Sequence, residues 1–310
     1  MENIDTNKNI EENDINKENS EEKAIIKHIV ISGGGPTGLT YYGVLKETNN
    51  SGVWNYKNIQ SIYGTSSGAI IGTIIALQYD WESIDDYLIK RPWNNLFKFN
   101  FHSILDSYNK RGIFDIKIIE EMFSPLFKGK DISIDVTMKE FYELTNIELH
   151  LFATELTDFV LIDFSYKTHP DWKVIEAIYC SSCLPILFSP YFKSEKYYCD
   201  GGLLTNYPLE QCIQNGAKLN EIFGIRRVEK ESTNKLNNDS NLFEYIMTIL
   251  HNVSKNLNSS ANKKIIVPNE TIIKSEYIEM YNIYAFANDF NVRAKLVNDG
   301  VKIAKNLGNS

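Results

Sequence analysis

The chain has 310 residues, of which 43% are hydrophobic and 23% are charged, as expected for a globular protein with one large core or two small ones. Its net charge of −8 argues against nucleic acid as the main partner, because phosphate binding requires clustered Lys and Arg side chains. The most apolar stretch, residues 68–77, is far shorter than the roughly 20 residues of a membrane span, so no transmembrane segment is predicted.

Residues 1–24 are predicted to form a disordered tail. Residues 1–23 contain eight acidic and three basic residues with almost no large apolar ones, so they cannot bury enough surface to offset the entropy of ordering. The tail also lacks the basic segment and apolar core of a secretory signal peptide. We therefore expect a cytoplasmic protein that reaches membranes as a peripheral protein and is not secreted through a classical signal peptide.

Strands and helices alternate through residues 25–307, which we expect to form one domain. Strands are predicted where apolar and β-branched residues cluster, and helices where a capping residue precedes an apolar period of about 3.6 residues. The predicted strands cover residues 24–32, 59–63, 147–154, 160–165, 197–199 and 221–228, the last taken as the final core strand. The first helix is predicted to follow the glycine-rich turn and to end near residue 46. Further helices are predicted over 69–77, from Asp80 toward 90, over 116–127, after Thr137, from Asp171 to before Pro185, over 208–216 and over 291–307.

This alternation predicts an α/β domain with a largely parallel sheet. Residues 229–260 interrupt it with an expected surface loop and an amphipathic helix. The cysteines are expected to be reduced and buried, and only Cys180 and Cys183 form a close pair, so no metal site and no cofactor is predicted.

A glycine-rich turn, GGGPTG at residues 33–38, separates the first predicted strand from the first helix. Consecutive glycines let backbone N–H groups converge on one point, and the helix start adds a positive dipole, so the turn is a candidate anion site. The spacing also fits the dinucleotide fingerprint of a Rossmann-like nucleotide-binding protein. That alternative predicts an acidic residue at the end of the second strand, where this chain has Ile62, Tyr63 and Gly64.

The second strand-to-helix turn reads Gly64-Thr65-Ser66-Ser67-Gly68. A G-x-S-x-G at this position is typical of a nucleophile elbow, in which a sharp turn exposes the serine hydroxyl and the flanking glycines relieve steric conflict. Ser66 is therefore the candidate nucleophile. The alternative is a tight turn in which the serine only caps a helix.

A nucleophilic serine needs a base, and the histidines offer little support for one. In α/β-hydrolases the histidine follows the acid on a late loop, whereas the late His251 lies inside a helical pattern and His150 lies inside a strand. We expect structural or surface roles for all five histidines: His28, His102, His150, His169 and His251.

The turn Asp200-Gly201-Gly202 supplies another candidate base, although Asp-Gly is also common turn chemistry. It follows a short strand, so its carboxylate can lie at the active edge of the sheet, and its glycines allow close approach of another loop. A carboxylate with a pKa near ~3.9 is a poor base for a hydroxyl, but burial would raise that pKa.

At these residues the chain resembles the patatin-like phospholipases, which combine a glycine-rich oxyanion loop, a G-x-S-x-G elbow and a D-G-[AG] motif in this order. Where that family often has a basic residue after the glycine triplet, this chain has Pro36 and Thr37, so the resemblance does not extend to a cationic contact from the loop. The resemblance covers about residues 25–307 and includes ATEL at 153–156, SSCLP at 181–185 and NYP at 206–208.

The resemblance implies a three-layer α/β/α fold and metal-free hydrolysis of carboxylic esters in phospholipids or related acyl lipids through an acyl-enzyme. Ser66 would be the nucleophile and Asp200 its proton acceptor, with a lipid or membrane surface as the substrate. An acyltransferase of the same mechanism stays open. The oxyanion hole would come from the backbone of Gly33, Gly34, Gly35 and Gly38.

Two apolar clusters are candidates either for lipid contact or for packing against the core. The first is an aromatic cluster that consists of Trp93, Leu96, Phe97, Phe99 and Phe101. The second is a helical stripe that consists of Leu242, Phe243, Ile246, Ile249, Leu250, Val253 and Leu257.

Overall fold

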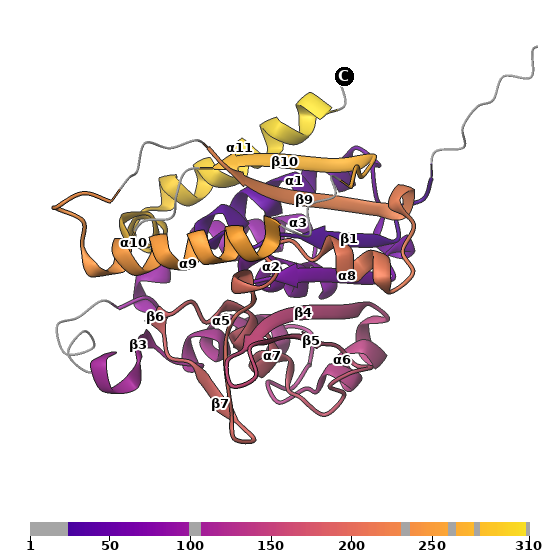
Figure 1. Cartoon of the computed structure of the whole chain (residues 1–310). Helices are drawn as coiled ribbons and strands as arrows, with labels where there is room; N and C mark the ends of the chain where they lie inside the picture. Colours follow the sequence, from indigo (N-terminus) through magenta and orange to yellow (C-terminus); the bar gives the residue numbers. More distant parts are fainter. Residues whose placement is uncertain (1–23, 99–106, 231–235, 260–264, 276–279, 308–310) are drawn as a thin grey trace, which may run out of the picture.

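The computed structural model describes residues 24–98, 107–230, 236–259, 265–275 and 280–307 (Figure 1). The predicted tail over residues 1–23 lies outside the described residues. So do His102 and two members of the aromatic cluster, Phe99 and Phe101.

A central sheet organises the chain, in the strand order β10-β9-β1-β2-β4-β8-β7, with β5 also paired to β4. The strands β10, β9, β1, β2 and β4 are parallel, whereas β5 and β8 run antiparallel to β4. The largely parallel sheet is therefore confirmed. The bounds are β1 His28–Ile31, β2 Ser61–Thr65, β4 Glu148–Glu155, β5 Val160–Phe164, β7 Tyr191–Lys193, β8 Lys196–Asp200, β9 Ile222–Glu229 and β10 Asn269–Ser275. Two short strands, β3 Gly112–Phe114 and β6 Ile186–Phe188, pair separately.

Helices cover both faces of this sheet, which gives the predicted three-layer α/β/α fold (Figure 1). The helices around the sheet are α1 Gly38–Asn50, α2 Ser67–Ala76, α3 Trp81–Asp85, α5 Lys117–Lys128, α6 Met138–Thr145, α7 Val174–Ser182, α8 Leu209–Gln214, α9 Leu242–Ser259, α10 Met280–Asn288 and α11 Phe290–Leu307.

The two faces bury unequal cores because strand side chains alternate. Ile29 and Ile31 of β1 enter the large core, which also contains side chains of α1, α2, α5, α7 and α11. Val30 points to the other face, where a smaller cluster contains Leu209 and Cys212 of α8. The four cysteines are free and buried.

Most predicted elements are confirmed, with shifted ends. Asp80 caps α3 by accepting the Ser83 N–H at 2.8 Å, and Thr137 and Glu140 form a capping box on α6. The predicted helix start at Asp171 is wrong: Lys173 occupies the N-cap of α7, because the Trp172 carbonyl accepts from Met138 and holds the preceding residues in a turn.

The prediction that the strand ending at Val228 is the last core strand is also wrong. β10 adds a further parallel strand outside β9, with Thr271 and Ile273 buried and Ile272 exposed. Its apolar signal is two adjacent isoleucines among polar residues, which is too short to be recognised as a strand period.

A buried histidine on β4 lies between two carboxylates. His150 Nδ1 is 2.8 Å from Asp163 and Nε2 is 3.1 Å from Glu148, while the ring stacks on Tyr63 with centroids 4.2 Å apart. Burial opposes the charged imidazolium, but the hydrogen bonds to Asp163 and Glu148 outweigh it, so the pKa of His150 is raised above the ordinary value.

This network makes a stability prediction. With a folded-state pKa above the unfolded one, charged His150 stabilises the fold below the unfolded pKa of about 6.5, and that contribution is lost as pH rises through the folded-state pKa. His150→Gln should therefore reduce the free energy of unfolding more at pH about 6 than at pH about 9, as measured by urea denaturation.

His28 provides the matched control, because burial lowers the pKa of this histidine. His28→Gln should reduce the free energy of unfolding less at acidic pH than at alkaline pH. A folded-state pKa below the unfolded one means that protonation of His28 favours the unfolded state. An equal cost of His150→Gln across the pH range would contradict a charged His150 in the folded state.

Candidate active site

Strand register places the candidate nucleophile level with the candidate base. Thr65, the last residue of β2, pairs with Phe152 of β4. The next residue of β4, Ala153, pairs with Asp200 at the end of β8. β5 pairs with the other edge of β4 over residues 151–155, so β2 and β8 follow one another along the same edge, and Ser66 and Asp200 meet where one ends and the other begins.

The turn that carries Ser66 is strained and closely packed. Ser66 has φ 56° and ψ −123°, a left-handed φ that few side chains adopt. A Cβ on Gly64 would lie 2.6 Å from the Gly68 carbonyl, and a Cβ on Gly68 would lie 2.4 Å from the Ile31 carbonyl oxygen. Both glycines of the elbow are thus required by close backbone contacts.

The C-terminal end of α7 and its C-cap residue, Cys183, hold both turns by hydrogen bonds. The Ser66 N–H donates to the Ser181 carbonyl at 3.1 Å and to the Ser181 hydroxyl at 3.0 Å, and the Asp200 N–H donates to the Cys183 carbonyl at 3.1 Å. In the sequence, this segment stands out only through the family resemblance. Its role rests on the carbonyls of Ser181 and Cys183 together with the Ser181 hydroxyl, and carbonyl groups leave little signal in side-chain patterns.

The Asp200 carboxylate is buried and accepts two hydrogen bonds. Its Oδ1 accepts the Gly202 N–H at 2.7 Å, and the Ser66 side chain also hydrogen-bonds to the carboxylate. Burial raises the pKa of Asp200 to about 6, against the opposing effect of these two hydrogen bonds. At neutral pH the group is therefore ionised but more basic than an exposed carboxylate.

The four glycines of the predicted oxyanion hole differ in whether their N–H groups are already hydrogen-bonded within the protein. The Gly33 N–H donates to the Asn206 carbonyl at 2.9 Å, and the Gly38 N–H bonds to the carbonyls of the 3-10 turn Gly35–Thr37. Among the described residues, no hydrogen bond uses the N–H of Gly34 or Gly35. These two groups are the donors of the loop that remain available to a bound oxyanion.

A pocket of about 660 Å³ contains Ser66, Asp200 and the glycine loop. One part of its wall is apolar and includes two members of the predicted aromatic cluster, Trp93 and Phe97. Its other apolar residues include Ile71, Ile118, Met122, Leu187, Phe188, Met247, Leu250, Ile283 and Phe286. Another part is charged and includes Arg226, Arg227, Glu229, His251 and Lys255.

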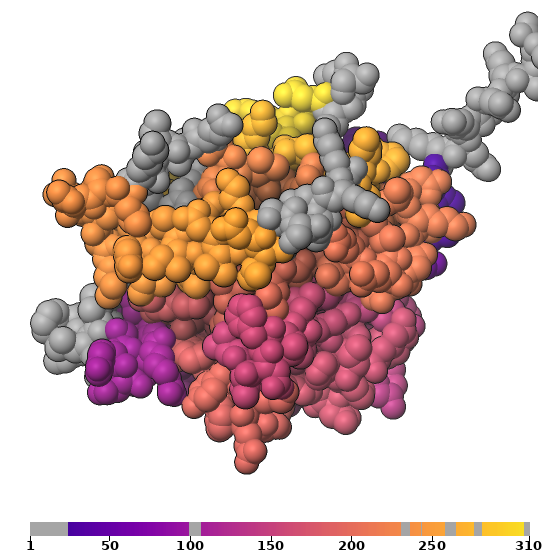
Figure 2. Space-filling view, in the orientation of Figure 1, coloured from indigo at the N-terminus to yellow at the C-terminus, as the bar shows by residue number. Residues whose placement is uncertain are grey.

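The helical stripe on α9 is divided between the active-site pocket and the surface. Leu250 lines the pocket, and Ser254 on the same side of the helix donates to the Gly202 carbonyl at 2.7 Å. Most of the stripe instead reaches the surface, where α9 forms part of the front face of the molecule in orange (Figure 2). The exposed fractions lie between 40% and 44% for Ile249, Val253 and Leu257 and reach 70% for Leu242.

Of the described histidines, His251 is the one that lines this pocket, and its Nε2 is 2.9 Å from Glu229. His28 bonds to Ser61, His150 lies in the network described above, and His169 packs against Phe164. His251 is therefore the alternative base that an experiment must test.

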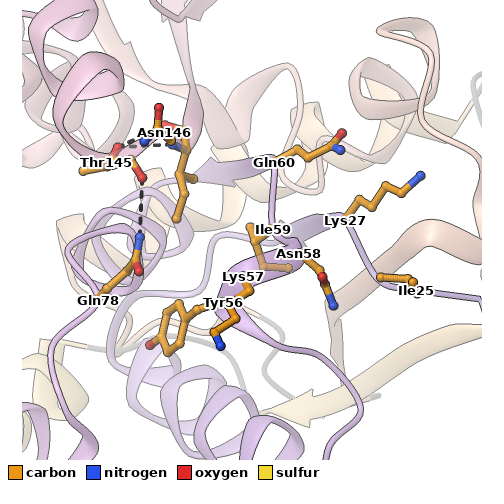
Figure 3. Close-up of a pocket in the computed structure, with 11 residues that line it drawn as sticks. Ile25, Lys27, Tyr56, Lys57, Asn58, Ile59, Gln60, Gln78, Thr145 and Asn146 are labelled. Carbon is orange, nitrogen blue, oxygen red and sulfur yellow. Dashed lines mark hydrogen bonds between the residues drawn. The ribbon is translucent and has the colours of Figure 1, made fainter.

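A second hollow, of about 490 Å³, lies at the opposite edge of the sheet (Figure 3). Residues before β1, β2 and β4 line it, among them Lys27, Gln60 and Asn146, and Gln78 there donates to the Thr145 carbonyl at 3.4 Å. Ligands of open α/β sheets bind at the carboxyl ends of the strands. We therefore place the candidate site at the pocket around Ser66.

Within the described parts of the chain, no group of three or more His, Cys, Asp and Glu side chains is arranged to hold a metal ion. Over the same residues, every helix is too short or too polar to cross a membrane.

Comparison with known proteins defines the family. The model of the patatin-like phospholipase family matches residues 29–213, so the chain belongs to this family. The "Probable lipid hydrolase 463L" of Invertebrate iridescent virus 6 is 29% identical over 197 residues, which cover 63% of this chain and 66% of that protein. The "Uncharacterized protein R571" of Acanthamoeba polyphaga mimivirus is 27% identical over 196 residues, which cover 62% of this chain and 64% of that protein. The chain thus spans just under two thirds of the length of both relatives.

A solved structure shows the same fold. VipD from Legionella pneumophila superposes with a TM-score of 0.55 over 92% of this chain and 67% of that chain, at 17% sequence identity. Family membership decides against the Rossmann-like nucleotide-binding alternative for the glycine loop.

The elbow makes a prediction about folding. Gly68→Ala should reduce the free energy of unfolding by about 1–3 kcal/mol, because its Cβ would meet the Ile31 backbone, even though Ala is otherwise the better helix residue. Urea denaturation measures this cost. Gly202→Ala is the matched control, since its Cβ meets only side-chain oxygens of Asp200 and Asn206 at 3.0 and 3.1 Å. Equal costs for the two variants would contradict the steric account of the elbow.

Proposed function

We propose that this protein is a lipid acyl hydrolase, which cleaves carboxylic ester bonds of phospholipids or related acyl lipids through an acyl-enzyme on Ser66. The observation that carries the proposal is the pairing of Ser66 with Asp200. The strained turn presents the hydroxyl, and the buried carboxylate that it contacts has a pKa raised to about 6. A poised base beside a presented hydroxyl is the requirement for nucleophilic catalysis.

In the first half of the reaction, Asp200 accepts the Ser66 proton while Oγ attacks the ester carbonyl carbon. The carbonyl oxygen becomes an oxyanion, which the N–H groups of Gly34 and Gly35 stabilise by about 3 kcal/mol each. Collapse of the tetrahedral intermediate expels the alcohol, which takes the proton from Asp200. The acyl group then remains on Ser66.

In the second half, Asp200 accepts a proton from water, whose oxygen attacks the acyl carbon. The second tetrahedral intermediate collapses, Ser66 leaves and regains its proton from Asp200, and the fatty acid is released. An alkoxide leaves more readily than an amide nitrogen, so a carboxylate base suits ester substrates. The apolar wall around Trp93 and Phe97 suits an acyl chain.

The dyad is tested by removing each member. Ser66→Ala should abolish covalent labelling by a fluorophosphonate, and Asp200→Asn should reduce kcat for a p-nitrophenyl acyl ester by a similar order, because both residues serve one step. The double variant should be about as inactive as the worse single variant, since groups that act as a unit are not additive. Thermal unfolding of each variant controls for loss of the fold.

The variant His251→Gln distinguishes a Ser66–Asp200 dyad from a catalytic triad that includes His251. It should reduce activity by less than about tenfold, whereas loss of a triad member costs several orders of magnitude. A folded Asp200→Asn protein with near-normal turnover, together with collapse of activity in His251→Gln, would instead favour a base built from His251 and Glu229.

The raised pKa of Asp200 predicts the pH dependence. Below about 6 the protonated carboxyl cannot accept the Ser66 proton, so kcat/KM for a soluble p-nitrophenyl ester should rise with pH through about 6 and then level off. This profile reports the free enzyme, and intrinsic fluorescence over the same range checks that the fold persists. If the rise of kcat/KM with pH shifts or disappears in His251→Gln, the group responsible for it is His251 and not Asp200.

A further inference from the structure

The charged end of the active-site pocket comes from β9 and α9. The glycine loop itself, GGGPTG at residues 33–38, carries no basic side chain. The cations that line the pocket are Arg226, Arg227 and Lys255, with His251 as a titratable fourth. Glu229 is the acidic group among them.

Arg227 lies beside the candidate oxyanion loop. A Cβ on Gly34 would lie 2.9 Å from Arg227 Cδ, while a Cβ on the preceding residue, Gly33, would lie 3.1 Å from Ser66 Cβ. Two consecutive loop residues therefore connect the candidate nucleophile to Arg227. The side chain is 12% exposed, so its charge is only partly screened by solvent.

The position of this guanidinium is set by its neighbours. The Arg227 backbone N–H donates to the Ser32 hydroxyl at 2.8 Å, and its Nε donates to the Ser275 hydroxyl of β10 at 2.6 Å. The carboxylate of Glu229 is 3.9 Å from the same guanidinium. Glu229 is also 2.9 Å from His251, so its charge is shared between two basic groups.

Arg226 differs because β9 turns its side chain to the opposite face of the sheet. Its guanidinium pairs with Glu270 of β10 at 2.7 Å, and Glu270 is the more deeply buried of the two. The charge of Arg226 is therefore neutralised within the fold. Arg227 is the arginine whose side chain lies beside the candidate oxyanion loop.

We propose that Arg227 determines substrate specificity by binding the phosphate of a phospholipid headgroup, an inference that rests on the proposed lipid hydrolase activity. A headgroup phosphate lies a few bonds beyond the ester oxygen, on the side away from the acyl chain. With the acyl chain against the apolar wall and the ester at Ser66, the phosphate points toward β9. Arginine suits this role because its planar guanidinium matches phosphate oxygens in a bidentate geometry.

The test compares two lipids that differ only in the phosphate headgroup. Phosphatidylcholine and diacylglycerol with identical acyl chains are presented in mixed micelles of a neutral detergent, and p-nitrophenyl butyrate reports the basal chemistry. The wild-type protein should favour the phospholipid. Arg227→Gln should raise KM for the phospholipid by about tenfold or more, with diacylglycerol and p-nitrophenyl butyrate changed by less than about threefold. Arg227→Lys keeps the charge but loses the bidentate geometry, so its KM for the phospholipid should lie between the values of the wild-type protein and Arg227→Gln.

Two further variants separate recognition from structure. Lys274→Gln, on the exposed side of β10, removes one positive charge outside the pocket and should leave all three substrates unchanged. Ser275→Ala removes the hydrogen bond to Arg227 Nε but keeps the guanidinium, and should retain the preference for phospholipid. Parallel losses on all substrates in Arg227→Gln and Ser275→Ala would show a structural role and overturn the proposal.

The outcomes also distinguish this inference from the proposed function. A wild-type protein that hydrolyses both lipids equally overturns the role of Arg227, even if Arg227→Gln fails to fold, and leaves the hydrolase intact. A wild-type protein inactive on every ester overturns both. Inorganic phosphate identifies the source of the ligand: it should compete only weakly with phospholipid. Tight inhibition of p-nitrophenyl butyrate hydrolysis, lost in Arg227→Gln, would assign the site to free phosphate and overturn the headgroup assignment.

Discussion

The candidate active site depends on one feature of the sheet: β4 continues beyond the end of β2, and the antiparallel β8 pairs with that extension. If β8 paired one residue further along, the strand period of two would turn Asp200 to the opposite face. The register thus couples the position of the carboxylate to the pairing of the whole sheet. At the end of this pairing the chain passes close to β4, where a Cβ on Gly201 would lie 2.1 Å from the Phe152 carbonyl oxygen, so glycine is required there.

The same site concentrates unfavourable local features that the surrounding fold must offset. Ser66 adopts a left-handed φ, and Asp200 is buried with a raised pKa, which means that ionising it costs stability. Both costs are tolerated because Ser181 and Cys183, at the C-terminal end of α7, accept hydrogen bonds from the N–H groups of Ser66 and Asp200. Local strain that persists only under such support is typical of functional sites.

Much of the architecture could be predicted from local patterns. The strands around Ile29, Ile62, Leu151 and Ile225 are short apolar runs, and the caps at Asp80 and Thr137 are side-chain signals within a few residues of their helices. The three motifs that contain Gly34, Ser66 and Asp200 could likewise be located at strand ends. These features share one property, since each is encoded within a short window of the chain.

What could not be predicted depends on contacts between distant segments. Asp200 lies beside Ser66 because of the registers in which β2 and β8 pair with β4, and no single strand encodes a register. The commitment of the Gly33 N–H to Asn206 joins residues 173 positions apart, and it reduces the available loop donors to Gly34 and Gly35. Arg227 reads as an ordinary strand residue until β9 is placed beside β1.

The central position of β1 has a consequence for biosynthesis. β1 pairs with β2 on one side and with β9 on the other, so one edge of the first strand stays open until nearly two hundred further residues have left the ribosome. The helix after it, α1, packs on α11, where a Cβ on Gly43 would lie 2.1 Å from the Val297 carbonyl. Folding therefore has to await the C-terminal segments. The nascent chain carries an unpaired β edge and an uncovered apolar helix in the meantime, both of which expose it to aggregation.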